Sequence, residues 1–191
     1  MRKLRVGDQE KAWLRAIPRL PALSSLQLCV NARSFGGKEL EGDDLTITQT
    51  LRVCACLASC QRLAHLDLTA APDVSSLQLL AAVGAAVGDR LRYLNFTYTS
   101  LPPTPGAAVR ALHTLVACYP HLEVLSLGMP FEMEASAAIA LSRELLQAVP
   151  ELAAPLCPAL RKVRVDNNTA RLQRHSDGRV VATSFVGSFF D

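Results

Sequence analysis

Six cysteines are the side chains of this sequence most able to do chemistry. Three of them, Cys54, Cys56 and Cys60, lie close enough together to suggest a metal cluster. None of the four histidines, however, is spaced from cysteine or carboxylate as a zinc site requires. On a helix these thiols would instead pack as small apolar side chains. The sequence therefore predicts no metal site. Because no secretory signal is visible, we expect the thiols to be reduced.

Two other combinations could belong to an enzyme. His65 and Asp67 would share one face of a strand, but no nucleophile is implied beside them. The segment Gly36-Gly37-Lys38 lacks the remaining residues of a phosphate-binding loop. We therefore expect no catalytic residue, no cofactor and no small-molecule substrate, and we predict that the protein is not an enzyme.

A phrase of the form Leu-x-x-Leu-x-Leu recurs along the chain, and it must define the elements that position any site. Intervals of 22, 40, 28, 31 and 38 residues separate its copies, and values near 28 suit a leucine-rich repeat of strand, turn and helix. The longer intervals predict insertions at residues 31–44 and 151–158, the second containing prolines that break a helix. The copies begin at Met1, Leu23, Leu63, Leu91, Leu122 and Leu160.

Between the copies the apolar spacing changes to that of a helix, as in Val109, Leu112 and Val116. The predicted fold class is α/β. Residues 1–169 would form a leucine-rich-repeat solenoid of about six strand–helix units, with parallel strands on the concave wall and helices on the convex side. The predicted helices span about 8–17, 44–59, 73–87, 105–118 and 134–149.

The two ends of the repeat array differ. Asp177-Gly178 between two extended segments predicts a hairpin, and residues 170–191 would form a C-terminal hairpin cap over the last repeat. No equivalent cap precedes the strand expected at the N-terminus. We expect another subunit to cover that apolar edge; the alternative is that the chain is a fragment.

Three strand entries carry a family resemblance. The segment Cys157-Pro-Ala-Leu-Arg-Lys-Val-Arg-Val and the segment Cys60-Gln-Arg-Leu-Ala-His-Leu-Asp-Leu resemble the cysteine-containing leucine-rich repeats of F-box-type and other intracellular adaptors. In the third, Cys118 stands one residue early. The resemblance covers residues 1–168 and implies an intracellular interaction protein, although no F-box is visible. The family's small polar turn residue, eight positions after the first leucine, is matched by Asn31, Thr99 and Asn168 and not by Ala71 and Pro130.

Side chains that alternate with the motif leucines would line the concave wall, because successive strand residues face opposite sides. Tyr93 is the best single anchor, since an aromatic ring buries a large area with little loss of entropy. The alternative is that this strand face is exposed to solvent and binds no partner. The predicted partner-binding residues are Lys3, Arg5, Gln27, His65, Asp67, Tyr93, Asn95, Lys162 and Arg164.

Composition narrows the class of partner. Charged residues make up 19% of the chain, below the roughly 25% usual for soluble domains, so part of the surface would be covered by other protein subunits. Net charge is only +3, and the two basic pairs lie five repeats apart, which disfavours RNA outside a larger particle. The longest apolar stretch, Leu77 to Val87, is too short to cross a bilayer.

These observations predict a non-catalytic protein–protein interaction scaffold, an accessory structural subunit of a larger assembly. The alternatives are a substrate-recognition adaptor of a ubiquitin ligase and an RNA-associated subunit of a ribonucleoprotein. We expect an intracellular location, cytoplasmic first and mitochondrial as the alternative.

Overall fold

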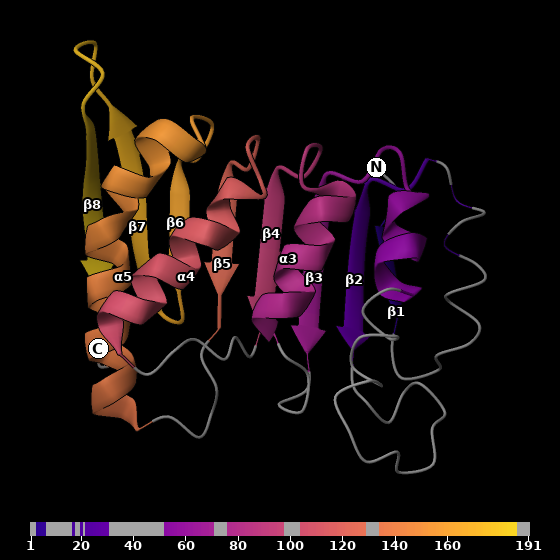
Figure 1. Ribbon diagram of the computed structural model, residues 1–191, viewed down its shortest axis with the longest axis horizontal. Coiled ribbons are helices and arrows are strands. Elements are labelled where there is room, and N and C mark those ends of the chain that lie inside the picture. The colour runs from indigo at the N-terminus through magenta and orange to yellow at the C-terminus, as the bar shows by residue number, and fades with distance from the viewer. Residues whose placement is uncertain are drawn as a thin grey trace.

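The computed structural model describes residues 3–6, 17, 20, 22–30, 52–70, 76–97, 104–128 and 134–186. Eight strands form one open sheet whose spatial order equals their order in the chain (Figure 1). The strands β1 to β6 pair in parallel, whereas β6, β7 and β8 pair antiparallel. Their bounds are β1 (Lys3–Val6), β2 (Ser25–Val30), β3 (His65–Ala70), β4 (Tyr93–Thr97), β5 (Val124–Leu127), β6 (Lys162–Val165), β7 (Asn168–Arg174) and β8 (Val180–Val186).

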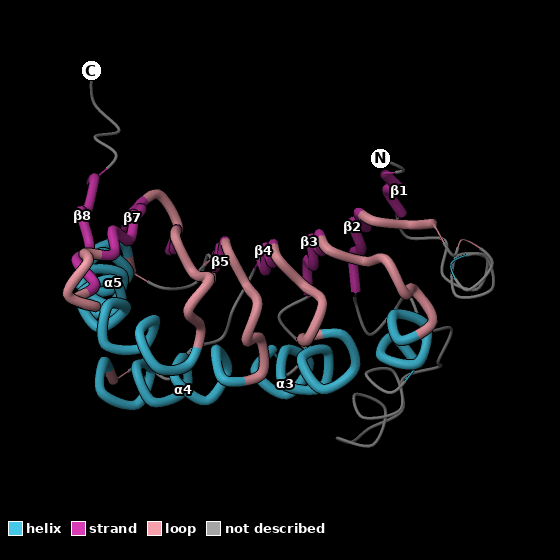
Figure 2. Tube along the Cα trace, turned by 90° about the horizontal axis from the view of Figure 1, so that it is seen from above, coloured by secondary structure: helices cyan, strands magenta, loops and turns pink. Residues whose placement is uncertain are grey.

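Helices return the chain from the end of one parallel strand to the start of the next. They are α3 (Ser76–Val87), α4 (Pro105–Ala117) and α5 (Ala135–Leu156), preceded by a helical segment at residues 52–58. Figure 2 shows these helices in a second layer on one side of the strands. The mixed α/β class, the parallel strands and three of the predicted helices are thus confirmed. The predicted helix at 8–17 and the insertion at 31–44 lie outside the residues that the structure describes.

The predicted helix break at residues 151–158 is wrong. Helix α5 continues through Pro150 and Pro155 and ends at Leu156. A proline inside a helix costs about 3 kcal/mol, because it removes a donor and its ring meets the preceding turn. Here α5 packs against β6, β7 and β8, and its side of that contact includes the buried Val149. Tertiary packing therefore outweighs the local preference of the prolines.

The recurring leucines form the core between the two layers. All three apolar positions of each described copy from β2 to β6 are at most 2% exposed. The backbone stacks them in register. The carbonyl oxygen at the residue just before a strand accepts two N–H groups from the next copy, as Ala64 accepts from Arg92 and Tyr93 at 2.9 and 3.0 Å. Ser24, Arg92 and Glu123 repeat this arrangement. Each copy is thus fixed to its neighbours by both packing and hydrogen bonds.

The buried position three residues before the first leucine is filled differently from copy to copy. Cysteine stands there at Cys60 and Cys157, and both are buried, as predicted for Cys60. The Sγ of Cys157 lies 3.1 Å from the carbonyl oxygen of Leu122 and 3.2 Å from that of Tyr119, so its single S–H joins one copy to the previous one. In the copy that begins at Leu122, Tyr119 takes this position rather than the neighbouring Cys118.

Tyr119 fits because α3 leaves room for it. Its hydroxyl donates a hydrogen bond to the carbonyl oxygen of Leu80 at 2.5 Å. A Cβ on Gly84 would lie 2.5 Å from the Cβ of Cys118 and 3.2 Å from the Tyr119 ring. A Cβ on Gly88 would lie 1.9 Å from the Cys118 carbonyl oxygen. Both glycines are therefore required by close approach of the next turn.

The C-terminal hairpin is confirmed, since β7 and β8 pair antiparallel around Asp177 and Gly178, whose φ is +83°. The sheet reverses direction one strand earlier than predicted. Asp166, with φ 51°, turns the chain directly from β6 into β7, so Asn168 starts a strand instead of filling the turn position of a repeat. In the part of the chain that the structure describes, no helix combines the length and apolar character needed to span a bilayer.

Candidate functional site

The candidate site is the face of the sheet opposite the helices, called here the open face. In β4 and β5 the burial alternates strictly, and the leucines point to the helix layer while their neighbours point away. None of the described helices lies on this side of the sheet (Figure 2). Two rows of residues cross it in register. Row one contains Lys3, Ser25, His65, Tyr93, Val124, Lys162 and Arg171, and row two contains Arg5, Gln27, Asp67, Asn95, Ser126, Arg164 and Thr169.

The centre of the open face carries an aromatic pair. The rings of His65 and Tyr93 are stacked, with their centroids 5.6 Å apart and their planes inclined by 19°. On the other side of Tyr93, the next strand places Val124. Burial raises the pKa of the Tyr93 hydroxyl above its ordinary value, the Asp67 carboxylate raises it further, and the Arg164 guanidinium lowers it. Tyr93 therefore presents a neutral hydroxyl that can both donate and accept a hydrogen bond.

Basic residues gather on the open face at β6 and β7. Lys162 and Arg171 are directly opposite each other in the antiparallel pair, and Arg164 follows two residues along β6. The N–H of Leu172 bonds to the carbonyl oxygen of Arg161, so the adjacent Lys162–Arg171 pair is of the non-hydrogen-bonded type. Side chains are closest in that type, with Cα atoms about 4.5 Å apart. We call Lys162, Arg164 and Arg171 the cationic cluster.

No ion pair joins the cationic cluster to a carboxylate of the described residues. Lys162 and Arg171 form no ion pair with any residue of the described ranges, and Arg164 donates its Nε–H to the backbone carbonyl of Asp166 at 2.5 Å. Arg164 and Arg171 are exposed, and Lys162 is half-buried. The cluster is thus positive and accessible in the described part of the chain.

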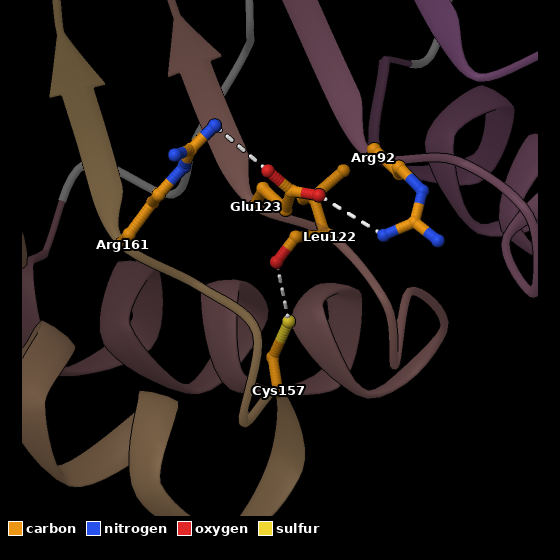
Figure 3. Close-up of polar contacts among 5 residues, drawn as sticks. All are labelled: Arg92, Leu122, Glu123, Cys157 and Arg161. Atoms are coloured by element: carbon orange, nitrogen blue, oxygen red, sulfur yellow. Dashed lines mark hydrogen bonds and ion pairs between the residues drawn. The ribbon is translucent and has the colours of Figure 1, made fainter.

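The strand-entry edge, one residue before the strands, has the opposite arrangement. Glu123 lies between two arginines and accepts from Arg92 at 3.0 Å and from Arg161 at 2.8 Å (Figure 3). We call these three residues the entry triad. They come from three successive copies, so the triad links β4, β5 and β6 outside the core. The charges here are largely paired with one another.

The predicted site residues all fall on the two rows, but they do not form one continuous site. His65, Asp67, Tyr93 and Asn95 are neighbours on β3 and β4, and β5 separates them from Lys162 and Arg164. Gln27 lies on β2, beside Asp67. Lys3 and Arg5 take their predicted places in the register of β1, five strands from β6 and therefore about 24 Å away.

Arg171 was missed because it lies beyond the last motif copy. The antiparallel return at Asp166 brings it opposite Lys162, which a model of parallel repeats does not place there. The pair Asp166-Asn167, two residues tolerant of a left-handed backbone between extended segments, was the available signal.

Burial affects the thiols of the cysteine cluster, Cys54, Cys56 and Cys60. Burial raises the pKa of Cys54 and of Cys60, and it raises that of Cys56 to about 12 together with the nearby Cys60. These thiols therefore stay protonated, whereas the thiolate is the nucleophile and the metal ligand. Among the described residues, no three metal-binding side chains are grouped closely enough to hold an ion.

Comparison with protein-family models, with curated proteins and with solved structures finds no match.

Proposed function

We propose that the protein is a leucine-rich-repeat solenoid that acts as a non-catalytic scaffold for other proteins, as an accessory subunit of a larger assembly. The repeat assignment is supported by the order of the sheet. Five parallel pairings join successive copies of one motif, and at four of these junctions the copies are hydrogen-bonded at the same position. Such folds use one long face for binding because every repeat presents its side chains in the same direction.

The observation that carries the functional proposal is the composition of the open face. Half-buried polar side chains surround one aromatic pair, and the described helices leave this side of the sheet uncovered. Tyrosine surrounded by polar groups is typical of the centre of a protein interface. Since burial keeps the thiols of Cys54, Cys56 and Cys60 protonated and no described group of side chains could hold a metal, this face is the best candidate for function.

The test is the native mass of the tagged full chain, purified gently from its own cells, with the co-purifying components identified. A discrete particle of fixed stoichiometry supports a structural subunit. A ubiquitin-ligase adaptor would instead give a free chain with exchanging partners. If no other protein co-purifies with the chain, the proposal is contradicted.

A variant pair locates the interface in the same experiment. Tyr93→Ala with His65→Ala removes the aromatic pair, whereas Arg110→Ala with Arg143→Ala changes two exposed residues on α4 and α5. We expect only the first pair to weaken co-purification. Equal retention by both would move the interface away from the centre of the open face.

A further inference from the structure

We infer that the cationic cluster binds an acidic segment of a protein partner, one that presents two or three Asp or Glu side chains to Lys162, Arg164 and Arg171. This inference rests on the proposed function and names the chemistry of the partner. It also names Arg171 as a binding residue, which the motif pattern did not.

The first argument is the cost of the bare cluster. Like charges directly opposite each other on neighbouring strands are destabilising, and the Lys162–Arg171 pair is of the type with the closest side chains. Neither Lys162 nor Arg171 forms an ion pair with a carboxylate of the described residues. A bound carboxylate between the two side chains would remove it, and arginine can bind a carboxylate through two parallel hydrogen bonds.

The second argument is where the charge of the protein is concentrated. Residues 157–186 contain six basic and two acidic side chains, a surplus of four positive charges. The whole chain carries only +3, so the remaining residues are slightly negative. Of the six basic residues, Arg161 is already paired with Glu123, whereas the three of the cationic cluster point from one face of the sheet. An acidic partner is therefore directed to this end of the open face.

The third argument distinguishes a protein from a nucleic acid. Single-stranded RNA is held by aromatic rings on which bases stack and by a basic groove that follows several phosphates. Both neighbours of the Tyr93 ring are occupied, by His65 on one side and Val124 on the other. Asp67 puts a negative charge two strands from Ser126 and three from Arg164, so the positive surface is short. This short positive surface can bind a few carboxylates better than it can bind a chain of phosphates.

The test compares two labelled probes by fluorescence anisotropy at low ionic strength: a glutamate-rich peptide and an oligouridine RNA of equal charge. The variant Lys162→Gln with Arg171→Gln removes the cluster. The variant Arg110→Gln with Arg143→Gln removes the same charge from the helix layer. We expect the wild type and the helix-layer variant to bind the peptide, and the cluster variant to bind at least about tenfold more weakly, with the loss falling as salt rises.

A denaturant titration excludes an unfolding artefact, because removal of the like-charge pair should leave the cluster variant at least as stable as the wild type. Failure of the wild type to bind the peptide, equal loss in both variants, or tighter binding of RNA than of peptide overturns the inference. In native purification, a cluster variant that enters the particle unchanged also overturns it, while the scaffold proposal stands. A wild-type chain without any partner overturns the scaffold proposal itself.

Discussion

The entry triad and the cationic cluster adjoin at β6, where Arg161 of the triad precedes Lys162 of the cluster, and their electrostatics are opposite. In the triad, Glu123 accepts charge-assisted hydrogen bonds from two arginines, at 3.0 and 2.8 Å. In the cluster, Lys162 and Arg171 are directly opposed with no described carboxylate between them. In the entry triad the charged side chains are paired with one another. In the cationic cluster, Lys162 and Arg171 have no ion-pair partner among the described residues.

The difference separates a position that stabilises the fold from positions that do not. The residue just before a strand accepts the backbone hydrogen bonds that stack one copy on the next. A charged side chain at this residue can therefore pair with the corresponding side chain of a neighbouring copy. Positions on the open face contribute little to the core and can carry unfavourable pairs. The opposed charges of Lys162 and Arg171 therefore cost stability, in keeping with the binding role inferred for them.

The largest effect should come from breaking the core beneath both regions. Leu125→Ala in β5, buried with no exposed area, should lower the free energy of unfolding by about 2 to 5 kcal/mol, because a cavity remains where the side chain packed. Denaturant titration measures it. Ile139→Ala is the control, since that side chain is 52% exposed on α5, and its change should stay within about 0.5 kcal/mol. Equal effects would contradict the assignment of the core.

The second largest effect on stability is expected from disruption of the entry triad. Glu123→Gln should lower the free energy of unfolding by about 1 kcal/mol, because two partly exposed ion pairs, each worth about 0.2 to 1 kcal/mol, are lost together. The loss should shrink as salt rises. Arg143→Gln on α5 changes an exposed arginine without such a pair in the described ranges and serves as the control. A salt-independent loss would mean that packing rather than charge holds the triad.

Reversing one charge in each region gives the sharpest contrast. Lys162→Glu should raise the stability by about 0.2 to 1 kcal/mol, because it converts a like-charge pair with Arg171 into an opposite-charge pair. Arg161→Glu, the adjacent residue, should lower stability by a similar amount, because it places two carboxylates together at Glu123. Thermal unfolding of both variants measures the signs. Two changes of the same sign would refute the contrast between the regions.

The order of strands and the core could be predicted from the sequence because both follow from a repeated pattern. The motif leucines have the same environment in every copy, so one rule places all of them. The candidate site was predicted only where that rule continues. Tyr93 and Lys162 were placed on the correct face by alternation, whereas Arg171 required the reversal at Asp166, which depends on one turn.

Two other features lay beyond the sequence pattern, and they have a common physical cause. The continuation of α5 through Pro155, where a helix break was predicted, and the space that Tyr119 fills both depend on contacts made far along the chain. Local propensity predicts a break at proline, and it carries no information about the space beside Gly84 and Gly88. Packing between copies determines both the course of α5 and the placement of Tyr119. The pattern of a single sequence carries no information about that packing.

The smallest predicted effect tests how far the cationic cluster acts. Burial and Asp67 raise the pKa of Tyr93, and Arg164 opposes them, so Arg164→Gln should raise that pKa further. Arg92→Gln, in the entry triad, should leave it unchanged, because Arg92 is paired with Glu123 and does not act on Tyr93. Alkaline titration of tyrosinate absorbance in a Tyr98→Phe background measures this, since the buried Tyr119 has its pKa raised well above that of Tyr93.

The sign for stability follows from the same shift. A raised folded-state pKa stabilises the protein at pH values below the ordinary value near 10 for tyrosine, and that contribution is lost as the pH rises through the folded-state pKa. In Arg164→Gln the loss should therefore be completed at higher pH than in the wild type. An unchanged profile would mean that the Arg164 charge does not reach the aromatic pair. The cluster and the centre of the open face would then be separate sites, and an acidic segment could bind one without contacting the other.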